Sequence, residues 1–577
     1  MKKTNSLICV ILSFGCFKRM EQSNEKQSYA FTPETCDFQY QALPNILRDN
    51  AKIFPDREAV VFLSTTGERT SIKYQELYDQ AKFFAKGLLE TGIKRNDVVA
   101  ISNKNCVEWV ISSLGVQMAG GMPLHFFFKR LDGSDLLETL HGIQKCTTLI
   151  IDPGDQDKNV DICRKFACNF QPEVSSSISS KVLVDLYQVL LLQHSHNGIK
   201  CSSVANIIER GRIALITLPL ISPDDIAAIF LTSGSTGIPK AVPQTHLSLV
   251  RSLYGFGKHM ELDPGARYYN DRPFSWTGGY PGVNIVHKTT RITASDVMHR
   301  DSVSRLKFSL EAENCTAALI ITPCLHDMMH TKLPPCLPVE SSCTKAAGVI
   351  ADKVVVMYGT TEFGLGSAMQ VSSPNDFEDY AIGYPTPGVE LKKVDDDGNI
   401  VPKGTSGEIY FRSRDRFQGY LNNKGKSALC SDKAGWYKTD DIGVMRENGI
   451  FIVNGRKSDM MIIGGLLVTP LCVENIIKKH PNVIDAYVYP VHDDKMFQRI
   501  YAAVVVQPEG TLSDEAIRNY IVQQQSGNLD SFLEKRYIPE HFFFYKELPH
   551  THNGKLDRKT TALMIELSTK AEGSTSN

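Results

Sequence analysis

The residues from Leu231 to Lys240, LTSGSTGIPK, combine hydroxyls, glycines and a lysine in one short stretch. Glycines let backbone amides approach an anion closely, the hydroxyls add hydrogen-bond donors, and Lys240 adds a positive charge. This combination suits a polyphosphate. The stretch is not a Walker loop, because Pro239 precedes the lysine where that motif has glycine. A flexible surface turn rich in serine and glycine is the alternative interpretation.

The surrounding sequence predicts the elements that would position this stretch. The apolar run 226–231 is typical of a buried strand that leads directly into it. Upstream, 74–91 has helical periodicity and ends at a capping glycine, 97–102 resembles a strand, and 107–118 resembles a helix. Strands that alternate with helices predict an α/β fold with a mainly parallel sheet, where ligands bind at the carboxyl ends of the strands.

The later part of the chain has a different pattern. Residues 153–205 carry little signal, and we expect mostly a surface excursion with some helix. Residues 383–421 are rich in glycine and proline with strand-like runs, which predicts a small β-subdomain. Beyond residue 467, helices are expected at 473–480 and 513–525, and strands at 484–491 and 501–506. We therefore predict a leader at 1–30, an N-terminal domain at 31–454 and a smaller α+β domain at 455–577.

Composition limits the classes of function. The 577 residues predict more than one domain, and a net charge of −1 gives no electrostatic reason to expect nucleic acid as a partner. The 14 cysteines form no C-x-x-C pair, which argues against a zinc site and favours reduced thiols in the cytoplasm. Met1–Met20 has a weak leader pattern that is too short to span a bilayer, so a membrane-associated or secretory route is the alternative. His326 and His330 are interpreted as a solvated helix face.

Four further motifs follow the glycine-rich stretch in one order: YGTTE at 358–362, YKTDDIG at 437–443, GRKSD at 455–459 and NGKLDRK at 553–559. Together with LTSGSTGIPK they resemble the adenylate-forming superfamily, which includes acyl-CoA synthetases, 4-coumarate–CoA ligases and firefly-type luciferases. The resemblance extends from about residue 40 to 560. It implies a large N-terminal AMP-binding domain and a mobile C-terminal lid domain.

The resemblance also implies a role for each motif. The nucleotide-binding residues would be Thr232, Ser233, Gly234, Ser235, Thr236, Gly237, Lys240, Tyr358, Gly359, Asp441 and Arg456. Of these, Tyr358 would stack on adenine and Asp441 would chelate the ribose hydroxyls. The catalytic residues would be Thr361 at the α-phosphate, Glu362 as the Mg²⁺ ligand and Lys555 between the attacking carboxylate and the α-phosphate. Trp276 would line the acyl pocket, Ser458 would be the hinge, and Gly464 and Gly465 would serve the coenzyme A step.

The implied reaction uses ATP, Mg²⁺, coenzyme A and a small carboxylic acid. The carboxylate attacks the α-phosphate and releases pyrophosphate, and the thiol of coenzyme A then displaces AMP. Because a carboxylate is already ionised at pH 7, the first step needs charge neutralisation and alignment, and it needs no general base. Trp276 and its apolar neighbours favour a hydrophobic acid, and we expect a medium-chain fatty acid.

Three departures from the family pattern bear on this expectation. The segment 333–353 lacks the Gly-Gly stretch that borders the adenine and acyl pockets in the family. Asp440 replaces a glycine, and the residues after Gly465 differ from the usual pattern of the coenzyme A step. The shortened segment 333–353 makes a non-catalytic nucleotide-binding pseudoenzyme one alternative, which a transcript covering 333–353 would test. A luciferase-like monooxygenase is another, which light output with added luciferin would reveal. The sequence does not indicate the oligomeric state.

Overall fold

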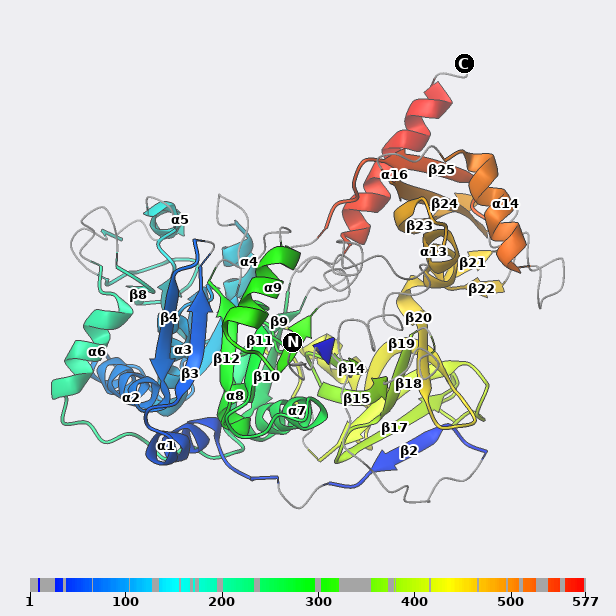
Figure 1. The fold of residues 1–577 in the computed structure, drawn as a ribbon. Coiled ribbons are helices and arrows are strands. Elements are labelled where there is room, and N and C mark those ends of the chain that lie inside the picture. Colours follow the sequence, from blue (N-terminus) through cyan, green and yellow to red (C-terminus); the bar gives the residue numbers. More distant parts are fainter. Residues whose placement is uncertain are drawn as a thin grey trace.

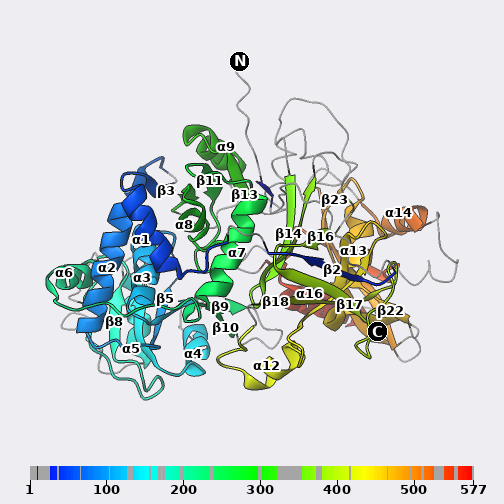
Figure 2. The ribbon, with the colours of Figure 1, turned by 90° about the horizontal axis from the view of Figure 1, so that it is seen from below.

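In the computed structural model shown in Figure 1, the described residues form four β-sheets with helices around them. The structure describes residues 9–10, 26–34, 38–64, 66–102, 104–126, 134–154, 157–166, 170–171, 176–194, 201–232, 239–295, 302–320, 354–371, 378, 380–414, 417–463, 466–493, 497–507, 512–525, 538–550 and 556–574. Three sheets lie side by side in the larger part of the molecule (Figures 1 and 2), and the fourth stands apart beyond the end of β20 (Figure 1).

The sheet that carries the predicted phosphate loop has six strands. In spatial order these are β10 (Lys240–Thr245), β9 (Ile226–Thr232), β6 (Met122–Phe126), β5 (Val98–Ser102), β7 (Cys146–Ile151) and β8 (Gln188–Leu191). All neighbours are parallel except β9 and β10. Alternate residues of β5 enter two different cores, so this sheet is buried on both faces. Burial on both faces is why β5 and β9 are almost entirely apolar.

The second sheet is also mainly parallel. It comprises β1 (Cys9–Val10), β13 (Ala317–Ile320), β11 (Arg267–Asn270), β12 (Thr290–Ala294), β3 (Glu58–Leu63) and β4 (Arg69–Lys73). Its helices and those of the first sheet are α1 (Leu43–Ile53), α2 (Tyr74–Glu90), α3 (Val107–Met118), α4 (Ser134–His141), α5 (Lys158–Phe166), α6 (Val204–Ile213), α7 (His246–His259), α8 (Val283–His287) and α9 (Ser302–Ala312). One core joins α2 and α3 to strands of both sheets, so these helices fill the space between them.

The third sheet is antiparallel and has eight strands. In order they are β14 (Val354–Thr360), β15 (Gly364–Val371), β16 (Ala381–Pro385), β20 (Phe451–Arg456), β19 (Tyr437–Met445), β18 (Gly407–Ser413), β17 (Val389–Val394) and β2 (Tyr29–Thr32). The short helix α12 (Lys424–Cys430) lies between β18 and β19 in sequence. The predicted small β-subdomain is thus one part of a larger sheet that also holds the Tyr358 and Asp441 motifs.

The C-terminal sheet contains β22 (Leu466–Val468), β21 (Met461–Ile463), β24 (Phe497–Val506), β23 (Val483–Asp493) and β25 (His541–Tyr545). Helices α13 (Pro470–Lys478), α14 (Asp514–Gln525) and α16 (Arg558–Ser574) flank it, and the 3₁₀ turn Lys457–Asp459 connects it to β20. Its core is separate from those of the N-terminal sheets. The predicted α/β class with a smaller α+β unit is confirmed, whereas the boundary near residue 455 stays a prediction.

The predicted helices at 74–91 and 107–118 and the strands at 97–102 and 226–231 correspond to α2, α3, β5 and β9. The expectation for 153–205 was wrong in part. This segment contributes β8 to the first sheet and buried side chains to its core, among them Cys163, Leu186 and Val189. A four-residue strand after a serine cluster is too short to show a period. Among the described residues, no helix is long and apolar enough to cross a membrane.

Candidate active site

Strands β9 and β10 fix the two ends of the predicted phosphate loop. Thr232 closes β9 and Lys240 opens β10, and the two are direct partners in the antiparallel register. The Thr232 hydroxyl is buried and has no hydrogen-bond partner among the described residues. An unpaired buried hydroxyl at the base of a loop is a donor available to a ligand. Ser233, Gly234, Ser235, Thr236 and Gly237 lie outside the described residues.

The hairpin of β14 and β15 carries the YGTTE motif next to this loop. Its turn is held by Gln244, at the end of β10, whose amide donates to the Thr361 carbonyl over 2.5 Å. Glu362 follows and is buried, with 8% of its surface exposed. A side chain on Gly359 would collide with the Gly364 carbonyl, at 2.3 Å from the new Cβ. The glycine is therefore required by the hairpin itself.

Lys240 and Glu362 meet through a residue that the sequence analysis missed, Tyr420. The phenol of Tyr420 donates to Glu362 Oε1 at 2.7 Å, and Lys240 Nζ donates to the phenol oxygen at 3.1 Å. The direct Lys240 Nζ to Glu362 Oε1 distance is longer, 3.6 Å. Burial and the nearby Glu362 carboxylate raise the pKa of Tyr420, so its hydroxyl stays protonated and donates.

Asp441 forms a second centre on β19. Its carboxylate accepts a short hydrogen bond from the Tyr358 hydroxyl and lies 3.5 Å from Arg456 Nε. Arg456 is its direct partner across β19 and β20. Burial raises the pKa of Asp441, although the contacts to Tyr358 and Arg456 oppose this. Three predicted nucleotide residues from three separate motifs thus converge.

Asp440, which the sequence analysis places where the resembled motif has glycine, adopts a left-handed conformation with φ of 66°. Its carboxylate accepts a hydrogen bond of 2.6 Å from the hydroxyl of Ser458, the predicted hinge residue. Lys457, beside it, pairs with Asp396 at 2.7 Å. The connection between β20 and the C-terminal sheet is therefore tied to the N-terminal part by polar contacts.

Trp276 lies in the loop between β11 and α8 and is half-buried. The fully buried Arg291 holds this loop by donating to the backbone carbonyls of Asn270 and Gly279. The structure gives no contact between Trp276 and the two centres above. Lys555, Gly464, Gly465, the segment 333–353, His326 and His330 all lie outside the described residues.

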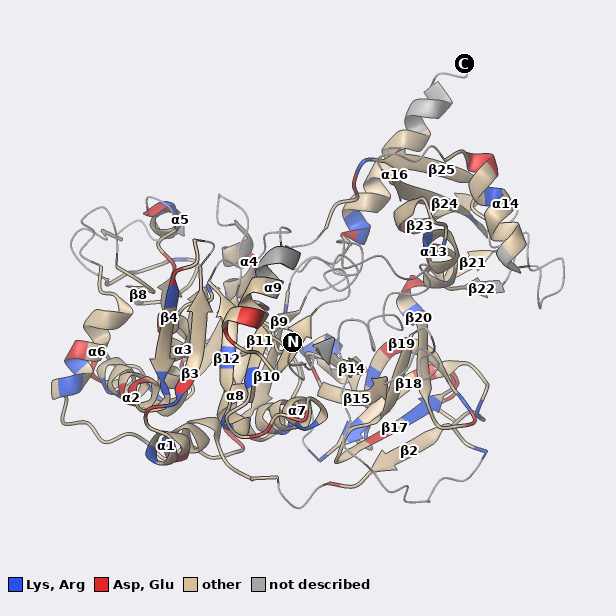
Figure 3. Cartoon of the chain, in the orientation of Figure 1, with Lys and Arg blue, Asp and Glu red and all other residues tan. Residues whose placement is uncertain are grey.

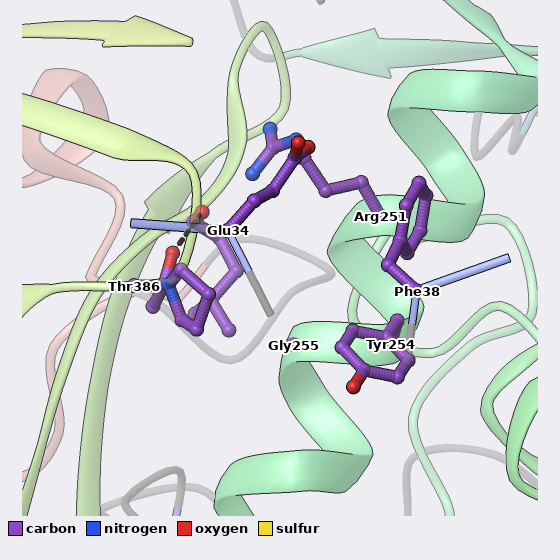
Figure 4. A pocket seen from close by; sticks show the side chains of 8 residues that line it. Glu34, Phe38, Arg251, Tyr254, Gly255 and Thr386 are labelled. Atoms are coloured by element: carbon purple, nitrogen blue, oxygen red, sulfur yellow. Dashed lines mark hydrogen bonds between the residues drawn. The ribbon is translucent and has the colours of Figure 1, made fainter. Parts of the chain in front are cut away.

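A small pocket lies between α7 and the segment that follows β2, and Figure 4 shows the Glu34 carboxylate and the Arg251 guanidinium pointing towards each other across it. Its lining residues are Glu34, Phe38, Arg251, Tyr254, Gly255, Leu365, Thr386 and Pro387. Its volume is about 10 Å³, which is room for one water molecule. This pocket is too small to bind a carboxylic acid.

The sequence signal for Tyr420 is weak. The run Gly419-Tyr420-Leu421-Asn422 resembles any turn after a strand, and its partners lie 58 and 180 positions away. Gln244 is equally inconspicuous in sequence, because its role depends on a turn 117 residues later. No local pattern would identify either residue.

Comparison with known proteins matches the chain to two family models. The model for the AMP-binding enzyme matches residues 47–421, and the model for the AMP-binding enzyme C-terminal domain matches residues 472–555. The first match covers more than half of the chain and includes the loop at 231–240 and the YGTTE motif. The second ends at residue 555.

Among similar curated proteins, the medium-chain fatty-acid–CoA ligase of Escherichia coli is 24% identical over 90% of this chain and 89% of its own length. The oxalate–CoA ligase of Saccharomyces cerevisiae is 24% identical over 88% of this chain and 94% of its own. The solved structure of o-succinylbenzoate CoA synthetase from Bacillus subtilis, in complex with ATP and magnesium, has a TM-score of 0.70 at 20% identity, and covers 90% of this chain and 99% of its own.

Proposed function

Because the chain belongs to the AMP-binding enzyme family of adenylate-forming acyl-CoA ligases, we propose that it joins a medium-chain fatty acid to coenzyme A through an acyl-adenylate. The observation that carries the proposal is the convergence of Asp441, Tyr358 and Arg456 from three motifs that are remote in sequence. Two similar proteins named as medium-chain ligases support a fatty acid of medium length as the substrate. An equally similar oxalate ligase is the counterexample that the test must address.

In the first step, a carboxylate oxygen attacks the α-phosphorus of ATP, and the bond to the β-phosphate oxygen breaks as pyrophosphate leaves. The loop 232–237 and Lys240 would bind the β- and γ-phosphates, where the unpaired Thr232 hydroxyl offers a donor. Thr361 would contact the α-phosphate, and Lys555 would neutralise charge between it and the carboxylate. Positioned cations of this kind typically contribute on the order of 10²–10³ in rate.

A divalent cation fits the surroundings of Glu362. Its carboxylate is buried and is held by the Tyr420 hydroxyl. Among the described residues, no group of three His, Cys, Asp or Glu side chains could hold a metal, but Mg²⁺ is usually bound by one or two carboxylates together with substrate phosphates. When bound there, Mg²⁺ would neutralise phosphate charge.

Asp441 would accept both ribose hydroxyls. Its burial and its hydrogen bond with Tyr358, the residue proposed to stack on adenine, support this role. Before Asp441 can bind the ribose, the Tyr358 hydroxyl must give up its hydrogen bond to the Asp441 carboxylate. The Tyr358 ring is then free to stack on adenine. Gly359, the next residue of the strand, would let the backbone approach the base. Arg456 would remain beside the ribose and phosphates.

In the second step, the thiolate of coenzyme A attacks the carbonyl carbon, and AMP leaves with the oxygen that it gained. Ser458 is the proposed hinge between the two steps, Gly464 and Gly465 serve the second, and Trp276 lines the acyl pocket. We also propose the cytoplasm as the location, on the basis of the scattered cysteines.

The test is ATP–pyrophosphate exchange with short, medium, long-chain, aromatic and dicarboxylic acids, beside the variant Lys555→Ala. We expect exchange with medium-chain acids only, and a loss of at least about 100-fold in the variant. Added coenzyme A should then yield the thioester. Exchange only with oxalate, or only with an aromatic acid, would refute the proposed medium-chain substrate. A protein that binds ATP but shows no exchange with any of the acids would refute the proposed ligase activity.

A further inference from the structure

Tyr420 is fixed in place by the strand that begins at Lys240. The backbone N–H of Leu421 donates to the Ala241 carbonyl at 3.0 Å, and the Asn422 side chain bonds both the Ala241 N–H, at 3.0 Å, and the Pro239 carbonyl, at 2.9 Å. The Tyr420 N–H donates to the hydroxyl of Ser427, in α12, at 2.7 Å. These hydrogen bonds fix the backbone of residues 420–422, and none of them involves the Tyr420 hydroxyl.

The hydroxyl of Tyr420 has a defined set of partners. A phenol has one proton to donate, and a lysine ammonium can only donate, so the phenol donates to Glu362 and accepts from Lys240. The Lys240 ammonium also lies 4.7 Å from the centre of the Tyr420 ring, within the range of a cation–π contact. A third neighbour, Cys430 Sγ, lies 3.5 Å from the phenol oxygen.

These contacts make Tyr420 the link between the proposed metal ligand and the proposed phosphate-binding lysine. Both distances to the phenol are shorter than the 3.6 Å between Lys240 and Glu362, so the phenol bonds each of them more closely than they contact each other. Tyr420 is itself 4% exposed and packs edge-to-face on Phe417, at 4.9 Å between ring centres. A buried and packed side chain holds its partners in one geometry, as an effective orienting group must.

We propose that Tyr420 is a positioning residue for the metal–nucleotide complex: its hydroxyl orients the Glu362 carboxylate and spaces it from Lys240, and thereby sets the affinity for ATP with a divalent cation. This rests on the proposed function of Glu362 as metal ligand. Groups that orient a metal ligand typically contribute 10- to 100-fold in metal affinity.

The experiment measures ATP binding to the full chain by titration calorimetry, once with Mg²⁺ and once with EDTA, for the wild type and Tyr420→Phe. This substitution retains the ring, its packing and its cation–π contact. We expect the dissociation constant with Mg²⁺ to rise about 10- to 100-fold, and that with EDTA to rise less than about threefold. The control is Tyr410→Phe, because Tyr410 is a buried tyrosine of β18 with no described hydrogen bond from its hydroxyl.

A double-mutant cycle shows whether Tyr420 acts through Glu362. In a Glu362→Gln background, Tyr420→Phe should cause no further loss of the Mg²⁺-dependent part of the affinity, because the oriented carboxylate is already gone. The inference would be overturned if Tyr420→Phe reduced the Mg²⁺-dependent affinity equally in both backgrounds, or if Tyr420→Phe bound ATP as tightly as the wild type. In either case, binding of Mg²⁺·ATP by the wild type would leave the proposed function standing. Failure of the wild type to bind ATP would overturn both.

Discussion

At the scale of single residues, Asp441 is the clearest case of a side chain held at a cost. Its carboxylate is 7% exposed, and burial raises its pKa in spite of Tyr358 and Arg456. Since the native state holds the proton more tightly than the unfolded chain, the stability from this group is present at low pH and is lost as pH rises through the raised pKa. Such a cost is typical of a residue that is kept for binding.

Asp441→Asn should therefore stabilise the ligand-free protein at pH 7 by about 1 kcal/mol and abolish ATP binding. The amide oxygen can still accept from Tyr358, while the buried charge is removed. The urea midpoint and an ATP titration measure the two effects on one sample. A lower urea midpoint with intact ATP binding would show that Asp441 is a structural residue.

Asp440 combines backbone strain with one hydrogen bond. At φ of 66°, an aspartate is tolerated better than alanine, and the Ser458 hydroxyl offsets part of the strain. Asp440→Ala should cost about 1–2 kcal/mol, because it retains the strain and loses the bond. Asp440→Gly, which restores the family residue, should stay within about 1 kcal/mol of the wild type in the same urea titration. Equal losses in the two variants would mean that backbone strain plays no part.

At the scale of elements, the loop that carries Trp276 depends on one buried guanidinium. Arg291 donates to the backbone carbonyls of Asn270, Gly279 and Arg272. The central carbon of its guanidinium, Cζ, lies 4.7 Å from the centre of the Phe274 ring. Burial lowers the pKa of Arg291 to about 10. The guanidinium thus replaces water for a group of buried carbonyls.

Arg291→Met should cost about 3–5 kcal/mol, since three carbonyls lose their donor in a dry environment. The matched control is Arg272→Met in the same loop, whose guanidinium pairs with the neighbouring Asp271 at 2.5 Å and is partly exposed. That change should cost less than about 1 kcal/mol. Thermal unfolding of both variants compares them directly, and similar losses would contradict the scaffold role.

The elements also show what could be predicted from the sequence. Helix α2 was predictable because it buries one face over several turns. Helix α3 is buried on all sides from Trp109 to Met118, and it was predictable because its largely apolar run has the length of a helix and ends before two glycines. Strand β9 was predictable because its apolar run is continuous. The strand β8 was missed because four residues show no clear period. The family resemblance predicted that Tyr358 and Asp441 each bind the nucleotide, but it did not predict the hydrogen bond between them. Tyr420 was missed because its contacts depend on how two sheets meet.

At the scale of the whole molecule, the charged side chains and the buried histidines have different distributions. Lysine, arginine and acidic residues are interspersed over the helices and loops of the described chain (Figure 3), in agreement with the net charge of −1. Other ionisable side chains lie in the interior instead. His125 and His246 are buried, and burial lowers the pKa of each to about 3. Both are therefore neutral in the folded protein.

These histidines predict acid sensitivity. Since the unfolded chain binds protons near pH 6.5 and the native state only near pH 3, their stabilisation is complete above pH 6.5 and is lost as pH falls towards 3. Each should reduce stability by up to about 1.4 kcal/mol per pH unit within that window. The urea midpoint should fall steadily from pH 6.5 to 5, and His246→Gln should make the fall shallower. A midpoint independent of pH would contradict the neutral, buried state.

The central claim is that these motifs activate a carboxylate by joining it to AMP. The most direct measurement is oxygen transfer from an acid labelled with ¹⁸O in its carboxylate, in a reaction with ATP and coenzyme A. Attack on the α-phosphorus followed by thiolysis leaves one labelled oxygen in the AMP, so mass spectrometry should find AMP two mass units heavier. Unlabelled AMP, or ADP as the nucleotide product, would contradict adenylation of the acid.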